Sequence, residues 1–122
     1  MKKYISFVLL CLICCFIACS KTSENGVLIR VENNTSQDFK EVFTYNKSFT
    51  NVKAFSVTSY EGFDKAGWLA WARLINTNND TTFVGSIMSA AAYTYLPDGK
   101  YTLKITMDTT AYYGHNCFYI KN

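Results

Sequence analysis

The sequence predicts an all-β protein, a single immunoglobulin-like or related two-sheet β-sandwich of about seven strands over residues 27–122. Three observations lead to this fold class. Apolar and polar residues alternate along several short segments, and turn-forming residues separate these segments. Nine Phe, nine Tyr and two Trp supply enough large apolar surface for a core. The length of 122 residues suits one domain, and no internal repeat is present.

Three strands are predicted in the N-terminal half of this domain. Residues 27–32 alternate between apolar and polar side chains, as a strand with one buried face does. Residues 39–45 form a second strand-like run. Residues 52–60 form a third, in which Phe55 and Val57 share a face.

Residues 67–75 are compatible with two structures. Trp68, Trp71, Ala72 and Ile75 fall at the spacing of one helical face. The segment is short, begins with a glycine and lies between strand-like runs, which favours a strand buried on both faces. The pattern alone leaves the helix open.

A further strand is predicted at residues 81–88, where Phe83 and Ile87 fall on the same side. Tyr93 and Tyr95 continue the same two-residue rhythm. This stretch therefore extends the strand pattern toward the C-terminal part of the domain.

The clearest strand lies at residues 100–107, where four apolar side chains alternate with Lys and Thr. Residues 96–99 precede it as a turn, because proline fixes one backbone dihedral and glycine tolerates the left-handed region. A polar loop at residues 108–116 and a strand at residues 117–121 complete the predicted domain.

An export signal precedes the domain. Two lysines are followed by an apolar run at residues 4–18, shorter than the roughly 20 residues that a membrane-spanning helix needs. Ala18 and Cys19 end this run and resemble a bacterial lipobox, in which the cysteine thiol receives diacylglycerol before the leader is cut. We therefore expect a lipoprotein signal peptide at residues 1–18, with an ordinary secretory signal as the alternative.

Lipid on Cys19 would hold the chain at a membrane. Each buried methylene of an acyl chain such as palmitate contributes about 0.8 kcal/mol, so two or more chains anchor a protein stably. Residues 19–26 are polar and predict a short flexible tether. Ser20 stands where an acidic residue would retain the protein, so the chain resembles lipoproteins sent to the outer membrane. The sequence leaves open whether the protein faces the periplasm or the cell surface.

Charge and cysteine content bound the function classes. The net charge is +3, and loss of Lys2 and Lys3 with the leader leaves 10 basic and 9 acidic residues. The basic residues are scattered singly, so we expect no nucleic-acid partner. Four of the five cysteines lie at residues 11–19, which leaves Cys117 as a single thiol that we expect to be buried in its strand.

Three segments of the mature chain carry a family likeness. Residues 29–42 read as a basic strand, a turn and an Asp-Phe pair, residues 59–73 form an aromatic segment, and residues 96–105 contain a Gly-Lys-Tyr core. Together they resemble small uncharacterised lipoproteins of the Bacteroidota, although Gly67 stands where those proteins carry an aromatic residue. The resemblance implies a lipid-anchored β-sandwich with a strand at Trp68, and it transfers no activity and no site residue.

Residues for catalysis are sparse. His115 is the only histidine and has no neighbouring metal-ligand pattern, so we expect neither a metal nor a cofactor. A nucleophilic pair of Cys117 and His115 is disfavoured, because a buried thiol stays mostly protonated. Phosphate-binding loops and nucleophile elbows are missing from the sequence. We predict no enzyme activity, with a hydrolase that joins His115 to two carboxylates as the outside alternative.

Two kinds of surface site are suggested. Thr81 and Thr109 each follow an aspartate and precede a threonine, which matches the O-glycosylation acceptor pattern of exported Bacteroidota proteins; ordinary turn residues are the alternative. Exposed aromatic rings could also stack on sugars. The candidate aromatic residues are Tyr112, Tyr113, Trp68, Trp71 and Tyr93.

The sequence thus predicts a lipid-anchored cell-envelope protein that acts as a non-enzymatic interaction or structural module. Its partner, a protein or a glycan, is left open. A surface glycan- or peptide-binding module is the first alternative, and a small inhibitor or immunity-type lipoprotein is the second.

Overall fold

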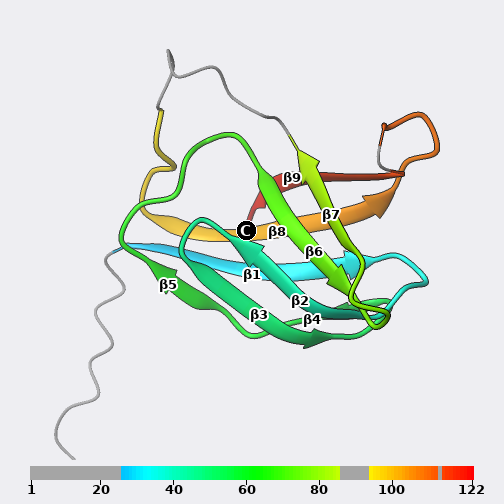
Figure 1. Cartoon of the computed structure of the whole chain (residues 1–122). Coiled ribbons are helices and arrows are strands. Elements are labelled where there is room, and N and C mark those ends of the chain that lie inside the picture. The colour runs from blue at the N-terminus through cyan, green and yellow to red at the C-terminus, as the bar shows by residue number, and fades with distance from the viewer. Residues whose placement is uncertain (1–25, 86–93, 113) are drawn as a thin grey trace, which may run out of the picture.

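The computed structural model describes residues 26–85, 94–112 and 114–122, and it confirms the two-sheet β-sandwich (Figure 1). These residues form nine strands and no helix. Seven strands are the main ones, as expected, and the short β4 and β5 share one edge. The strands are β1 (Val27–Asn34), β2 (Phe39–Thr44), β3 (Lys47–Val52), β4 (Ser56–Val57), β5 (Glu61–Phe63), β6 (Trp71–Asn76), β7 (Thr81–Gly85), β8 (Gly99–Met107) and β9 (His115–Lys121).

The strands form two sheets. Sheet A has the order β4-β1-β8-β9, with β5 also pairing with β1, and sheet B has the order β3-β2-β6-β7. β1 and β8 are parallel, and the other pairs are antiparallel. β4 and β5 lie one after the other along β1, and Thr58 joins them there by donating its amide to the Val31 carbonyl at 2.9 Å.

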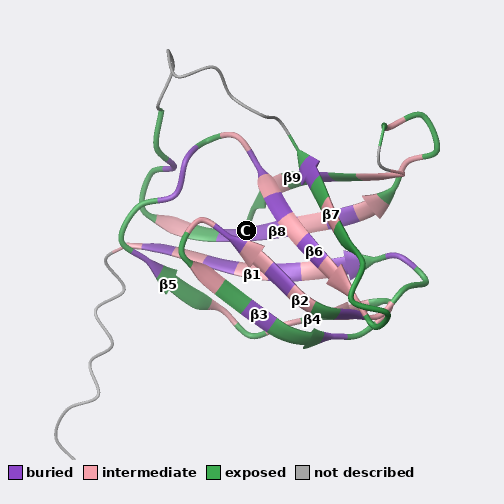
Figure 2. Ribbon diagram, in the orientation of Figure 1, coloured by how far each residue is buried: buried purple, intermediate pink, exposed green. Residues whose placement is uncertain are grey.

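The core lies between the sheets, and buried residues recur along the main strands of both sheets (Figure 2). The strand alternation that predicted the fold therefore also defines its buried face. The largest contributions come from Ile29, Val31, Leu103 and Ile105 of sheet A and from Val42, Val52 and Leu74 of sheet B.

The prediction for residues 52–60 is wrong. β3 ends at Val52, and Phe55 lies in a turn with a positive φ of 52° and a 72% exposed side chain. Val57 is also exposed, because β4 is an edge strand. Alternation of apolar residues at an edge does not require burial, which explains the error.

Residues 67–75 contain a strand and not a helix, since β6 covers residues 71–76. The prediction that this strand is buried on both faces, however, is wrong. Ala72 and Leu74 face the core, whereas Trp71 and Arg73 lie half-buried on the outer face of sheet B. Among the described residues no second layer covers that face, so only one face of β6 is fully buried.

Three smaller differences occur in the C-terminal half. Phe83 points outward and is 53% exposed, while its neighbour Val84 fills the core. Met107 is exposed because β8 extends past the core. His115, expected in a loop, begins β9 and pairs with Met107. Ile87, also expected in this strand, lies outside the described residues.

The sandwich has two distinct ends. At the entry end, where β1 begins, the Gly99 amide donates to the Gly26 carbonyl at 3.1 Å. At the far end, the fully buried Asn33 donates through Nδ2 to the carbonyls of Gln37 and Lys53 at 2.8 and 3.0 Å. Its Oδ1 accepts both the amide and the hydroxyl of Thr35. Asn33 thereby ties three chain segments together.

Candidate functional site

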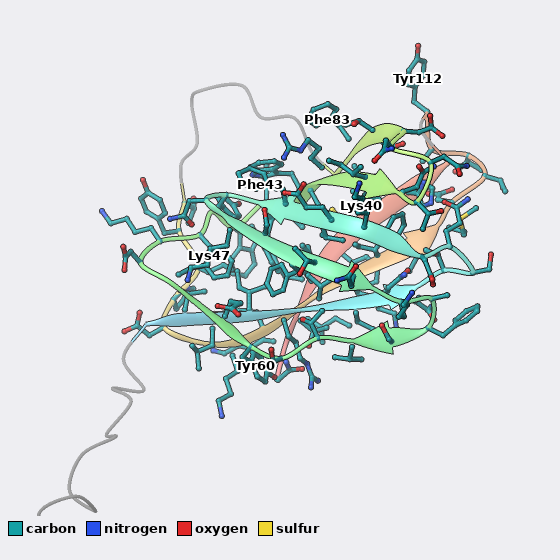
Figure 3. The ribbon with its side chains drawn as sticks, turned by 60° about the horizontal axis from the view of Figure 1, so that its bottom comes forward. Lys40, Phe43, Lys47, Tyr60, Phe83 and Tyr112 are labelled. Atoms are coloured by element: carbon teal, nitrogen blue, oxygen red, sulfur yellow. The ribbon has the colours of Figure 1, made fainter. Side chains whose placement is uncertain are left out.

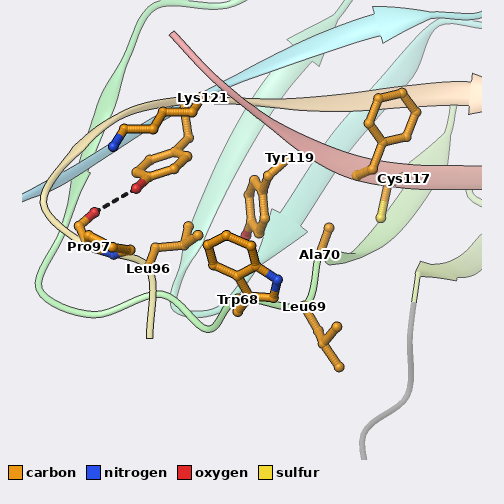
Figure 4. A pocket seen from close by; sticks show the side chains of 10 residues that line it. Trp68, Leu69, Ala70, Leu96, Pro97, Cys117, Tyr119 and Lys121 are labelled. Atoms are coloured by element: carbon orange, nitrogen blue, oxygen red, sulfur yellow. Dashed lines mark hydrogen bonds between the residues drawn. The ribbon is translucent and has the colours of Figure 1, made fainter. Parts of the chain in front are cut away.

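A groove of about 500 Å³ opens beside β9, the last strand of sheet A among the described residues (Figure 4). Its volume lies in the range of small-molecule and peptide-side-chain sites. Pro97 and Lys121 lie at one end of the groove and Cys117 at the other. The lining residues are Trp68, Leu69, Ala70, Leu96, Pro97, Tyr101, Cys117, Phe118, Tyr119 and Lys121.

Trp68 is held in the groove wall by backbone contacts. Its amide donates to the Thr94 carbonyl at 2.7 Å, and the preceding Gly67 forms a bridge with Tyr95. The hydroxyl of Tyr45 lies 2.9 Å from the Gly67 carbonyl oxygen, and a Cβ on Gly67 would come within 2.8 Å of that hydroxyl. A side chain at residue 67 would therefore displace the Tyr45 hydroxyl from this position. The Trp68 indole remains 60% exposed.

The opposite wall consists of tyrosines from β8 and β9. The Tyr101 hydroxyl donates to the Pro97 carbonyl at 2.8 Å, and its ring meets Tyr119 edge-on at 6.3 Å. Burial of Tyr119 raises the pKa of its phenol, and the nearby Tyr45 raises it further. The Tyr119 phenol is therefore neutral at physiological pH, and this wall is largely apolar.

Cys117 is buried, as predicted. Burial raises the pKa of its thiol to about 12, so the thiolate is scarce at neutral pH. His115, two residues earlier on β9, contacts the Phe39 ring edge-on at 5.9 Å. The Asp108 carboxylate, nearest to His115 in sequence, accepts the amide and hydroxyl of Thr110. Cys117 in this groove is suited to packing and not to nucleophilic attack.

The groove has a simple electrostatic character. Of the residues that the structure places in its lining, Lys121 is the one cation and none is a carboxylate. The remaining lining side chains are apolar or aromatic. The groove can therefore accept an apolar or aromatic ligand body that is neutral or carries a negative group near Lys121.

A second, smaller hollow of about 270 Å³ lies near the far end. Its lining includes Phe83, His115 and Tyr112. Tyr112 is 91% exposed and projects from the 108–114 loop (Figure 3). This hollow is smaller than the groove, and polar residues such as His115 and Asn116 contribute to its lining. It is therefore the weaker candidate for a binding site.

The structure separates the predicted aromatic residues. Trp68 lies in the groove, whereas Trp71 packs on the outer face of sheet B against Phe43 and Tyr45, at centroid distances of 6.1 and 5.5 Å. Phe43 and Phe83 lie on this same outer face (Figure 3). Tyr112 lies on a distant loop, and the predicted Tyr113 and Tyr93 lie outside the described residues. The three described candidates, Trp68, Trp71 and Tyr112, therefore lie on separate parts of the surface.

Several predicted sites stay predictions. Thr81 begins β7 and Thr109 lies in the 108–114 loop, and both are exposed. Cys19 and the leader lie outside the described residues. In the described part of the chain, no helix is long and apolar enough to cross a membrane, and no three His, Cys, Asp or Glu residues group around a possible metal site.

Searches of family models, of curated proteins and of solved structures each returned no match. Sequence reasoning singled out Trp68 but missed Leu96, Pro97, Tyr101 and Lys121 as its neighbours. Their one sequence signal was the turn before the clearest strand, which placed Leu96 and Pro97 at the end of a sheet.

Proposed function

We propose that this chain is a lipid-anchored cell-envelope protein of the Bacteroidota type, and that its domain acts as a non-enzymatic binding module. The lipobox at Cys19 supports the anchor and Ser20 supports the outer membrane as its site. The exposed Trp68 indole in an apolar groove is the observation that carries the binding role. Solvent-exposed tryptophan beside other aromatic walls is typical of recognition surfaces.

A peptide or protein segment is the ligand class that the groove favours. The apolar body of such a segment fits the walls of Leu96, Tyr101 and Tyr119, and a carboxylate on the partner can meet Lys121. The Cys117 thiol, protonated at neutral pH, adds apolar surface without reactivity. This role also accommodates an inhibitor or immunity-type protein, which binds one partner chain.

Glycan binding is the second candidate, because a flat indole can stack on a sugar ring. In that case Trp68 supplies the platform and Lys121 the contact to an acidic sugar. Binding to a glycan array and binding to a peptide array distinguish these two ligand classes.

The test uses the mature lipoprotein on a peptide array and on a glycan array. Trp68→Ala is expected to weaken binding at least about tenfold, because tryptophans at the centre of a binding site contribute most of the affinity. Tyr112→Ala is the matched control, since it removes an exposed aromatic ring away from the groove. Equal loss in both variants, or undiminished binding by Trp68→Ala, would contradict the groove. Glycan signals without peptide signals would select the second candidate.

A further inference from the structure

The outer face of sheet A carries positive charge at the entry end. Its side chains are fixed by strand register: Arg30 of β1 lies opposite Thr102 of β8, and Lys100 lies opposite Leu28. The Arg30 guanidinium and the Lys100 ammonium both lie over the Tyr60 ring, at 5.1 and 5.8 Å from its centroid. Tyr60 thus brings two cations to one spot.

Hydrogen bonds order this cluster. Arg30 donates through Nε to the Thr102 hydroxyl at 3.0 Å. The Asn122 amide donates to the same hydroxyl at 2.8 Å and to the Tyr60 hydroxyl at 2.9 Å. The Arg30 guanidinium is therefore held on an ordered frame, so a ligand that binds it costs little side-chain freedom at this residue.

The charge on this face is unbalanced. Elsewhere in the described residues, Lys47, Lys53 and Arg73 each form an ion pair with a carboxylate. The outer face of sheet A has Glu32, which is paired with Lys104 at 2.9 Å. In the part of the chain that the structure describes, neither Arg30 nor Lys100 forms such a pair. Two positive charges are left for an external anion.

Apolar side chains accompany these cations. Ile120 of β9 lies opposite Thr102, and Phe118 lies opposite Lys104. Phe118 and Ile120 are 42% and 39% exposed. Exposed aromatic and aliphatic side chains next to Lys and Arg are the composition of surfaces that sit at a bilayer interface, where the cations meet headgroups and the apolar groups enter between them.

The face also lies where the proposed anchor would place it. The chain enters the domain at Gly26, whose carbonyl accepts a hydrogen bond from the amide of Gly99, the neighbour of Lys100. A tether of residues 20–26 reaches at most about 25 Å from a lipidated Cys19. Such a tether keeps the domain at high local concentration near the bilayer, so a weak contact is enough to dock it.

We propose that the outer face of sheet A docks on the anionic phospholipid headgroups of the bilayer that holds the lipid anchor, with Arg30 and Lys100 as the headgroup contacts. This inference rests on the proposed lipid anchoring. Docking in this orientation leaves sheet B facing away from the membrane and keeps the groove beside β9 open at the side.

The test measures acetylation of lysine amines on the lipidated protein, reconstituted into vesicles of phosphatidylcholine alone or with added phosphatidylglycerol. Lys100 is expected to react several-fold more slowly in the anionic vesicles, because headgroups shield it. Lys40 and Lys53 are internal controls, since they lie away from this face. Peptide mass spectrometry reads all three sites. Equal Lys100 rates in both vesicles, or slowing of Lys40 to the same degree, would overturn the docking.

A charge variant sharpens this test. Each basic residue near an anionic bilayer contributes about fivefold in affinity. Arg30→Gln with Lys100→Gln should therefore weaken docking about 25-fold. The readout is Lys104, which lies on the same strand and face as Lys100. We expect anionic vesicles to slow its acetylation in the unmodified protein and not in this double variant. Lys40→Gln with Lys53→Gln removes the same charge elsewhere and should keep the slowing. If the first pair fails to fold, the unmodified protein still decides the question.

Two further readouts separate the sources of failure. A protein that does not stay with any vesicle fails in its lipid anchor, whereas one that stays but shows unshielded Lys100 fails only in docking. Inorganic phosphate without vesicles, at matched ionic strength, should leave the Lys100 rate unchanged. Slowing by phosphate alone would identify a free anion as the ligand and would contradict the membrane surface.

Discussion

At the far end of the sandwich, Asn33 and Thr35 are buried and every polar atom of the Asn33 side chain is bonded, whereas at the entry end an exposed Trp68 stands over an open groove. Both ends belong to the same two sheets. The difference indicates that one end is closed for stability and that the other keeps apolar surface exposed at a cost in stability. The entry end is therefore the part of the molecule suited to binding.

Removal of the Asn33 side chain should destabilise the protein more than any other change considered below. Asn33→Ala removes a fully buried side chain that donates to two carbonyls and accepts two donors, so we expect a loss of roughly 3 kcal/mol in unfolding free energy. Urea unfolding followed by circular dichroism measures it. The exposed neighbour Asn34 is the matched control, and Asn34→Ala should change stability by less than about 0.5 kcal/mol. Similar losses for both would refute the closed-end account.

The two tryptophans should differ in how much they stabilise the fold. Trp71→Ala should cost about 2 kcal/mol, because its indole packs against Phe43 and Tyr45 on sheet B. Trp68→Ala should cost less than about 1 kcal/mol, because most of its indole is already in solvent. Thermal melts of the two variants compare them directly. A larger loss at Trp68 would make it a structural residue and not a binding one.

Cys117 tests whether the groove is a reactive site. With a pKa of about 12, only about one thiol in ten thousand is ionised at pH 8. We expect iodoacetamide to leave Cys117 of the folded protein unmodified at that pH and to alkylate it once urea unfolds the chain. Intact mass reports both states. Rapid alkylation of the native protein would revive a nucleophilic role.

The smallest effect concerns acid. Hydrogen bonds from the Ala54 amide and the Lys53 ammonium lower the pKa of Asp38 below 3.8, and hydrogen bonds from Thr110 lower that of Asp108. A lowered pKa in the folded state adds stability above the unfolded value, and this stability is lost as pH falls below about 3.8. Asp38→Asn with Asp108→Asn should flatten the fall in melting temperature between pH 5 and pH 2. An unchanged slope would assign the fall to other groups.

The sequence predicted the strands that have one buried and one exposed face. Residues 27–32 and 100–107 show this alternation because both belong to the centre of sheet A. Phe55 and Phe83 misled the prediction, since an exposed aromatic residue reads the same as a buried one in a sequence. The groove could not be predicted as a whole, because its lining comes from separate segments that meet through the Gly67 and Tyr95 bridge and the hydrogen bonds beside it.

The outer face of sheet A shows the same limit. The cluster of Arg30, Tyr60 and Lys100 comes from three distant parts of the chain. The register of β1 with β8, and with β5 directly after Tyr60, brings these residues together. Scattered basic residues in a sequence therefore do not exclude a local cluster of positive charge.

The proposed function depends on lipid at Cys19 that anchors the chain to a membrane. Mass spectrometry of the N-terminal peptide from the purified native protein tests it most directly. We predict a peptide that begins at residue 19, with diacylglycerol on the cysteine sulfur and no trace of residues 1–18. A peptide with an unmodified Cys19 thiol, or with the leader still attached, would contradict the account.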